Sequence, residues 1–225
     1  PALGNTQTVD SLAADTGLSY AEWMRGYMNV IVATDNPLIA LEDWDTLAGT
    51  PLTRPSLNDV TIAYDVGTLS ECAAVVAAWV DADGKTALRV IRQAPGSAWL
   101  APYVAKLAEK YPDAAIWADD GGPTRRATDD LRERFGLADR IRPMRFTERG
   151  IADAALLAAI TETRSIRHDG SVSLRCDIAN AVTKESNGTP IFHRDKSTAP
   201  IPALIAASVA AYGAAHPPEQ TWVLP

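Results

Sequence analysis

Hydrophobic and polar positions follow a strand pattern along residues 60–65, VTIAYD. Larger apolar side chains alternate there with smaller ones, which is the spacing of a β-strand, and the run ends on Asp65. Residues 72–93 predict two further strands joined by a hairpin, because Asp83 and Gly84 between them form a strong turn signal. This part of the chain is therefore expected to supply three antiparallel strands.

Helices and strands are expected to alternate after that hairpin. Residues 97–112 place Leu100, Val104 and Leu107 on one apolar face, and Pro112 ends the helix. The expected elements are helix 97–112, strand 114–119, helix 120–136, strand 141–147, helix 148–168, helix 174–184, strand 189–195 and helix 201–213. This order predicts an α/β protein with a mixed sheet of antiparallel and then parallel strands, flanked by helices.

Three segments are expected along the chain. Residues 1–58 form an acidic lead-in, with a helix over residues 19–32 followed by a stretch rich in turn-forming residues. Residues 59–215 form the α/β domain, and residues 216–225 form a proline-rich tail. The sequence begins without methionine, which suggests a piece excised from a longer chain.

Composition and charge narrow the class of protein. The chain has 225 residues, 47% of them hydrophobic, and its net charge of −7 argues against a generally basic, nucleic-acid-coating surface. No apolar run reaches the roughly 18 residues of a membrane-spanning helix, and the N-terminal stretch lacks the features of a signal peptide. Cys72 and Cys176 fit neither a zinc motif nor a disulfide framework, which favours a reducing compartment.

Two of the expected strands end in aspartate. Asp65 closes the first, and Asp119 followed by Asp120 closes strand 114–119. If these strands are neighbours, the carboxylates meet at one end of the sheet, where they repel each other unless a proton or a cation intervenes. Oxygen ligands of this kind suit Mg²⁺ and similar ions. Each aspartate taken alone also fits a turn or a helix cap, so the spacing leaves both interpretations open.

The stretches VTIAYDVGT, AAIWADDGGPTRRATDDL and STAPIPALIAASVAAYG together resemble the nuclease domain of the large terminase subunit, which packages DNA in tailed bacteriophages. The lead-in residues GLSYAEWMRGYMN and LEDWDTL resemble the segment that joins the ATPase domain of that family to its nuclease. The resemblance implies an RNase H-like fold and a preceding ATPase domain that this sequence lacks. It covers most of the chain, although each motif is short.

The resemblance also implies site residues. Asp65 matches the central metal ligand of the family and Asp119 the second acid, with Asp120 as a neighbouring substitute. Relatives carry a third acid at the start of the last helix, where this sequence has prolines instead. Asp195 is the nearest carboxylate, with His193 as an auxiliary base. Other possibilities are that water replaces the third ligand or that the activity is damaged.

Arginines are concentrated near the second acidic strand end. Residues 121–175 contain eleven arginines and no lysine, against eight acidic residues, although the rest of the chain is acidic. A planar guanidinium suits phosphate contacts, whereas ion pairs along helix surfaces are the alternative use of such residues. With the resemblance in view, Arg125 and Arg126 are the expected DNA contacts.

With the resemblance in view, the prediction is a metal-dependent endonuclease that cuts concatemeric viral DNA by two-metal hydrolysis with Mg²⁺ or Mn²⁺. The resemblance implies double-stranded DNA, a terminase small subunit and a portal protein as partners, no membrane, and action in the host cytoplasm. Two alternatives stay open: a catalytically impaired module that grips DNA or docks on the portal, and another RNase H-like nuclease such as a junction resolvase.

Overall fold

The computed structural model describes residues 38–49, 52, 55, 59–186 and 188–217. The helix expected over residues 19–32 lies outside the described residues. None of the helices within these ranges combines the length and apolarity needed to cross a bilayer. Cys72 and Cys176 are both free thiols.

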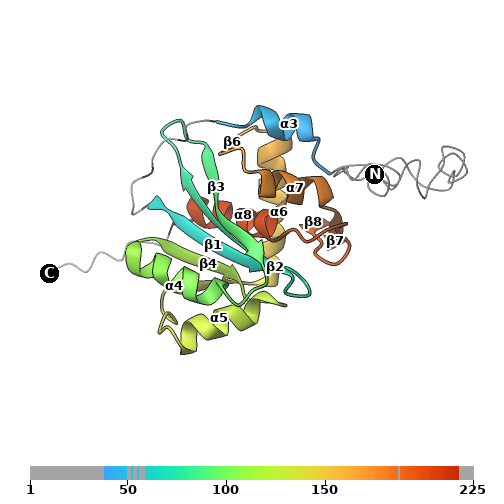
Figure 1. Ribbon diagram of the computed structural model, residues 1–225. Coiled ribbons are helices and arrows are strands. Elements are labelled where there is room, and N and C mark those ends of the chain that lie inside the picture. The colour runs from blue at the N-terminus through green and yellow to red at the C-terminus, as the bar shows by residue number, and fades with distance from the viewer. Residues whose placement is uncertain (1–37, 50–51, 53–54, 56–58, 187, 218–225) are drawn as a thin grey trace, which may run out of the picture. The chain divides into compact units, whose positions relative to one another are not determined.

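A mixed sheet of six strands forms the centre of the described chain (Figure 1). The strands are β1 (Thr61–Val66), β2 (Cys72–Val80), β3 (Thr86–Pro95), β4 (Ala115–Asp119), β5 (Ile141–Met144) and β6 (Ile166–His168), in the spatial order β5-β4-β1-β2-β3-β6. The first three are antiparallel, as predicted, and β4 and β5 extend the sheet parallel to β1. The predicted hairpin between β2 and β3 is confirmed, and Gly84 has the positive φ of +75° that its turn requires.

Helices cover both faces of the sheet. On one face α4 (Leu100–Lys110) and α5 (Thr124–Glu133) pack against Ile62, Tyr64 and Val75. The opposite face is covered by α3 (Leu41–Thr46), α6 (Phe146–Thr161), α7 (Val172–Asn180) and α8 (Pro202–Ala215). The resulting layers confirm the predicted α/β class.

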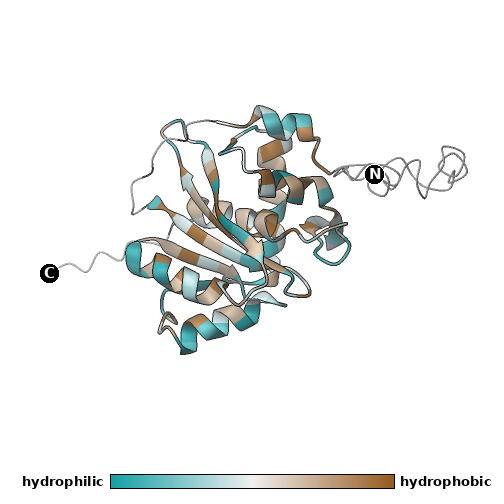
Figure 2. Ribbon diagram, viewed as in Figure 1, coloured by the Kyte–Doolittle hydropathy of each residue, from teal (hydrophilic) through white to brown (hydrophobic). Residues whose placement is uncertain are grey.

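Helix α8 is the most deeply buried helix in the described chain. Its residues 203–207, ALIAA, are all fully buried, and the segment is apolar on every side, which is typical of a helix enclosed by other elements. Figure 2 shows this contrast, because α8 carries little of the teal colour that marks the outer faces of α4 and α5. The sheet and helices α6 and α7 enclose α8.

Two short strands that were not predicted shorten two of the predicted helices. The helix predicted over residues 148–168 ends at Thr161, Arg164 takes a left-handed φ of +50°, and β6 then pairs in parallel with β3. The helix predicted over residues 174–184 ends at Asn180, because Ala181 is extended. The chain then forms a separate hairpin of β7 (Thr183–Ser186) and β8 (Thr189–Phe192).

The described end of the lead-in belongs to the same core. Ile39 and Trp44 are buried in the cluster that contains α6 and α8, and the Trp44 ring stacks on His168 of β6 at 3.8 Å between centroids. Ala48 forms an isolated parallel bridge with His168. The division into residues 1–58, 59–215 and 216–225 stays a prediction.

Gly213 permits the close approach of α8 to the sheet, and a Gly213→Ala substitution should therefore destabilise the protein. A Cβ at this position would lie 2.7 Å from Thr61 Cγ2 and 2.8 Å from Trp117 Nε1. We expect a loss of about 1–3 kcal/mol in the free energy of unfolding, despite the better helix propensity of alanine. Urea denaturation measures this loss, with Ala215→Ser at an exposed position as the control. Equal stability of Gly213→Ala and the parent chain would contradict the expected clash.

Candidate active site

Asp65 and Asp119 lie side by side because β1 and β4 run parallel and in register. Tyr64 is paired with Ala118, so the next residue of each strand is an aspartate. Both side chains point to the sheet face that carries α6 and α8, where Asp65 is fully buried and Asp119 is 8% exposed. The predicted meeting of two strand-terminal carboxylates is therefore present in the structure.

Both oxygens of the Asp65 carboxylate have protein partners. Thr124, the first residue of α5, donates its hydroxyl to Oδ1 at 2.8 Å and accepts the Val66 amide at 3.2 Å. The Arg194 guanidinium contacts both oxygens, with Nε 3.3 Å from Oδ2. Burial raises the pKa of Asp65, and the Arg194 charge opposes that shift by favouring the ionised form.

Asp119 is held by two guanidinium groups. Its Oδ2 accepts a hydrogen bond from Arg194 Nη2 at 2.9 Å and another from Arg149 Nη1 at 2.9 Å. Arg149, on α6, also binds Asp153 one helical turn further along, with 2.9 Å between Nε and Oδ1. Asp153 in turn accepts the Ser208 hydroxyl and the Phe192 amide. A continuous polar network therefore joins β1, β4, α6, β8 and α8.

Burial and the neighbouring carboxylates shift the pKa of Arg194 in opposite directions. Burial alone lowers the pKa of Arg194, but the carboxylates of Asp65 and Asp119 outweigh burial and raise it. The guanidinium therefore stays charged and supplies positive charge between the two carboxylates.

The other predicted ligands have hydrogen-bond partners of their own. Asp120 faces Arg132 on α5, with both nitrogen–oxygen distances at 3.4 Å. Asp195 accepts the Thr68 hydroxyl at 2.9 Å. In the described part of the chain, no three His, Cys, Asp or Glu side chains are grouped so that they could hold a metal ion. The structure thus brings Asp65 and Asp119 together but not Asp120 or Asp195, whose roles as ligands stay predictions.

His193 is placed near the site, but its ring is already engaged. Its Nδ1 accepts the Lys196 amide at 3.2 Å, so a neutral ring carries its proton on Nε2. In that form neither nitrogen has a free lone pair with which to take a proton. This geometry does not favour the expected role as an auxiliary base.

A carboxylate from α7, that of Asp177, lies at the start of the last helix, α8. Asp177 Oδ2 accepts the backbone amides of Ala203 at 2.6 Å and Leu204 at 3.2 Å, while Pro200 and Pro202 occupy the positions where relatives were expected to carry an acid. Burial raises the pKa of Asp177 to about 7. Its carboxyl caps α8, and the nearby negative charge of Asp65 adds to the burial that raises its pKa.

The two arginines predicted to contact DNA occupy the exposed start of α5. Arg125 and Arg126 are both exposed, and Arg125 forms a weak pair with Asp129 at 3.8 Å. They directly follow the turn at Gly121 and Gly122 that leaves the end of β4. Their position is compatible with a contact to a phosphate backbone near the acids.

A pocket of about 380 Å³ opens above the acid pair. Its polar lining includes Asp119, Arg149, Lys184, Arg194 and Asp195. Phe146, an exposed side chain at the start of α6, lies on the same lining. Cations therefore outnumber acids among the charged groups of this pocket, which suits an anionic substrate.

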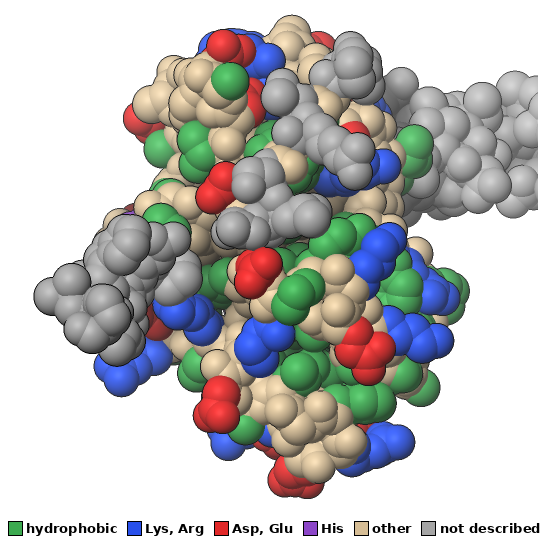
Figure 3. Space-filling model, turned by 90° about the vertical axis from the view of Figure 1, so that its left-hand side faces the viewer, with side chains coloured by type: hydrophobic (Ala, Val, Ile, Leu, Met, Phe, Trp, Pro, Cys, Tyr) green, Lys and Arg blue, Asp and Glu red, His purple; other side chains and the backbone are tan. Residues whose placement is uncertain are grey.

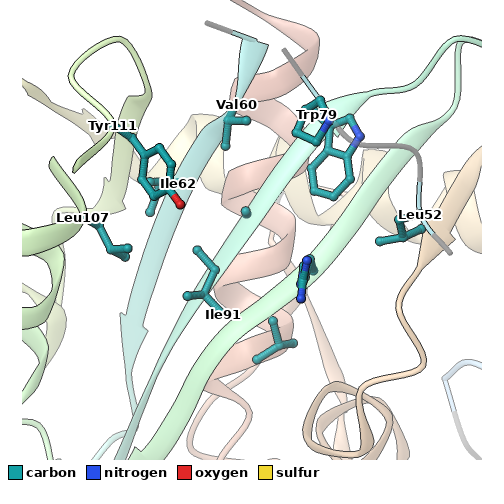
Figure 4. A pocket seen from close by; sticks show the side chains of 11 residues that line it. Leu52, Val60, Ile62, Trp79, Ile91, Leu107 and Tyr111 are labelled. Carbon is teal, nitrogen blue, oxygen red and sulfur yellow. The ribbon is translucent and has the colours of Figure 1, made fainter. Parts of the chain in front are cut away.

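A larger cavity of about 630 Å³ lies at the opposite end of β1. Val60, Ile62, Trp79, Ile91 and Tyr111 point into it from β1, β2, β3 and the end of α4 (Figure 4). Figure 3 shows that the left-hand side of the molecule, as Figure 1 is drawn, carries hydrophobic side chains together with charges of both signs. The lining contains no group of acids, so the pocket above Asp65 and Asp119 is the better candidate for chemistry.

Sequence reasoning missed several residues of the polar network and the acid that caps α8. They are Thr124, Arg149, Asp153, Asp177 and Arg194. The only signal available was the presence of charged residues inside otherwise apolar helices, as in IADAALLAAI and LRCDIANA. An acid on the apolar face of such a helix must have a partner, because burying it alone is costly.

Comparison with solved structures identifies the fold. The large terminase of bacteriophage HK97 superposes with a TM-score of 0.63 at 16% identity, over 95% of this chain and 52% of that one. The chain has the fold of a terminase nuclease domain. The nuclease of phage G20c matches with a TM-score of 0.54 at 15% identity, over 78% of this chain and 97% of that one.

The nuclease domain of bacterial virus Sf6 gp2, as a K428A mutant with manganese and β-thujaplicinol, matches with a TM-score of 0.51 at 14% identity, over 79% of this chain and 98% of that one. The G20c nuclease has also been solved with magnesium bound. No protein-family model and no curated protein matches the sequence. The chain spans about half the length of the HK97 terminase. The strand order and the structural match together confirm the predicted RNase H-like sheet.

The buried carboxyl of Asp177 should make stability depend on pH. A folded-state pKa of about 7 lies above the unfolded value of 3.8, so the folded protein prefers the protonated form and loses stability as the pH rises from about 4 to 7. We expect Asp177→Asn to remove this loss, because an amide oxygen still accepts the α8 amides. At about 1.36 kcal/mol per pKa unit, the variant should gain on the order of 2–4 kcal/mol relative to the parent between pH 4 and pH 8.

Urea denaturation of both chains at several pH values measures this difference. Asp113→Asn, at an exposed position, serves as the control and should follow the parent at every pH. A constant difference between Asp177→Asn and the parent would show that folding does not raise the pKa of Asp177.

Proposed function

We propose that the chain is the nuclease domain of a large terminase and that it hydrolyses phosphodiester bonds of double-stranded DNA with divalent metal ions. The observation that carries the proposal is the approach of Asp65 and Asp119, whose carboxylates both lie within hydrogen-bond distance of the single atom Arg194 Nη2. Carboxylates this close can be bridged by one divalent cation. The fold shared with terminase nucleases supports the same assignment.

The residues around the pair fit a hard cation. Asp65 and Asp119 would hold Mg²⁺ or Mn²⁺, and Asp195, which lines the same pocket, is the candidate for a second ion if its carboxylate leaves Thr68. When bound, such ions activate water and stabilise the leaving oxygen of the phosphodiester. The protein orients the ligands: Thr124 fixes one oxygen of Asp65, and Arg149 fixes Asp119. These fixed positions spare the site from reorganising during the reaction.

Substrate binding is assigned to the positive side chains around the pocket. Lys184 and Arg194 line it, and Arg125 and Arg126 extend the charge along α5. Contacts of this kind bind phosphates without reading bases, which suits a nuclease that cuts concatemeric viral DNA during packaging. As part of a longer packaging motor, the domain would work beside an ATPase, a small subunit and a portal protein in the host cytoplasm.

A second candidate function is a DNA-gripping module with impaired catalysis. Two observations favour it: the Arg194 guanidinium lies between the two acids, and the described residues bring no third acid to them. The same fold and the same basic pocket would then serve to hold DNA or to dock on the portal. Cleavage by the purified chain separates the two functions.

Cleavage of supercoiled plasmid tests the nuclease assignment. With Mn²⁺, we expect the parent chain to produce nicked and then linear DNA, because each domain cuts one strand. Asp65→Asn and Asp119→Asn should each lower the rate by more than the about 10- to 100-fold that outer-shell substitutions cost at metal sites. Asp83→Asn, on the distant hairpin turn, is the matched control. Absence of cleavage by the parent at every metal concentration would favour the gripping module.

The role of Asp195 is tested in the same assay. If Asp195 completes a two-ion site, Asp195→Asn should cut more slowly and calorimetry should show one bound Mn²⁺ where the parent binds two. Thr68→Val, which removes only the hydroxyl partner of Asp195, should retain both ions. An Asp195→Asn variant that cuts as fast as the parent would remove Asp195 from the site.

DNA affinity tests the two exposed arginines. Replacing Arg125 and Arg126 together by alanine should weaken binding to a duplex and lower the slope of log K against log salt by about two, one for each lost phosphate contact. The control is the pair Arg89→Ala and Arg134→Ala, which removes equal charge from side chains that are 68% and 67% exposed. Equal salt slopes for the two double variants would mean that Arg125 and Arg126 do not contact the phosphate backbone.

A further inference from the structure

Arg194 places its positive charge between Asp65 and Asp119, and its side chain has room to move out of that position. It follows directly after β8 and His193, and its guanidinium reaches Asp65 on β1 and Asp119 on β4. Because both acids use the same nitrogen, Nη2, the guanidinium stands between them and not beside them. A divalent ion bridging the same oxygens would have to take this position.

The charges around the acids require a cation in that position. Asp65, Asp119 and Asp153 bring three negative charges, and Arg149 and Arg194 bring two positive ones. Without the Arg194 group the cluster would carry two uncompensated negative charges beneath the surface, which is strongly unfavourable. One divalent ion would neutralise it fully. Either a guanidinium or a metal ion can therefore supply the positive charge that these carboxylates require.

The two arginines of the cluster differ in how firmly they are held. The Arg149 side chain is 3% exposed, lies within helix α6 and is tied to Asp153 as well as Asp119. The Arg194 side chain is 19% exposed, follows a short strand and lines the open pocket. Its Nη1 lies over Gly122, where even a Cβ would only just touch it, at 4.0 Å. Arg194 therefore has room to turn outward, whereas Arg149 does not.

We propose that Arg194 is a displaceable cation that holds the metal-free site together and competes with divalent metal for Asp65 and Asp119. The proposal depends on the assignment of these two acids as metal ligands, but not on cleavage of DNA. Metal binding and release of the guanidinium are then one exchange. The apparent metal affinity is the intrinsic affinity multiplied by the fraction of time for which Arg194 leaves the site free. The exchange delivers a free guanidinium to the pocket that receives the substrate.

Direct binding of Mn²⁺ tests this exchange. If the guanidinium occupies the site for nine-tenths of the time or more, Arg194→Ala should bind Mn²⁺ at least about tenfold more tightly than the parent. Isothermal titration calorimetry on the full chain gives the affinity, and Arg89→Ala, whose side chain is 68% exposed on β3, serves as the matched arginine control with parental affinity. Adding Asp65→Asn to Arg194→Ala should abolish the gain, which assigns it to this site.

Thermal unfolding gives a second readout. In EDTA, Arg194→Ala should melt below the parent, because two acids are left without their cation; saturating Mn²⁺ should raise its melting temperature more than that of the parent. Arg194→Lys keeps one positive charge without the planar fork and should fall between the two in Mn²⁺ affinity. It also provides a folded variant should the alanine variant fail to fold.

Three results would overturn the proposal. They are unchanged Mn²⁺ affinity in both Arg194 variants, a melting deficit that Mn²⁺ does not repair, and no Mn²⁺ binding by any of the chains. A chain that shows the exchange but does not cut plasmid would contradict the proposed nuclease function alone. A chain that cuts, with equal Mn²⁺ affinity in the parent and the variants, would contradict the exchange alone.

Discussion

Two carboxylates at the ends of adjacent parallel strands require positive charge between them, and the surrounding structure depends on meeting that requirement. Asp65 has no exposed surface, so water cannot compensate its charge. Arg194 and Arg149 do so instead, and Asp153 extends the network to α8 and β8 through Ser208 and the Phe192 amide. Sheet, helices and hairpin thus meet in one network of ion pairs and hydrogen bonds, and removal of a charged member leaves a neighbouring buried charge with fewer partners.

At the start of α8, an acidic residue close to the candidate site has a structural role. Proline opens α8, which leaves no carboxylate of its own at that end, and Asp177 from α7 accepts the amides of Ala203 and Leu204. A carboxyl at a helix N-terminus receives unpaired amides and the positive end of the helix dipole. Burial nevertheless keeps the proton on Asp177 up to a pKa of about 7. The acid at this position therefore stabilises the start of the helix through its two amide hydrogen bonds.

The sequence pattern predicted the helices and strands that are long or strictly alternating. It thereby also predicted that Asp65 and Asp119 stand at strand ends. The alternation in 60–65 and the apolar run before Asp119 specify strands whose ends can be read from the sequence. Strands β6 and β7 have only three and four residues and follow helical patterns, so no periodicity reveals them. Arg194 lies 129 residues from Asp65, and nothing in its own neighbourhood indicates that contact. The acids of the site could be predicted, whereas their counterions depend on the complete topology.

The two edges of the sheet limit how this molecule associates with other chains. At one edge, β5 has four residues and contains Pro143, which offers no amide hydrogen for a further ladder. At the other edge, β6 has only three residues, and the bridge from Ala48 to His168 occupies part of its free side. Long unpaired edges invite strand addition and aggregation between copies of a protein. The β5 edge is therefore a poor template for a foreign strand, whereas among the described residues no strand pairs with residues 89–95 of β3 on the side of β6.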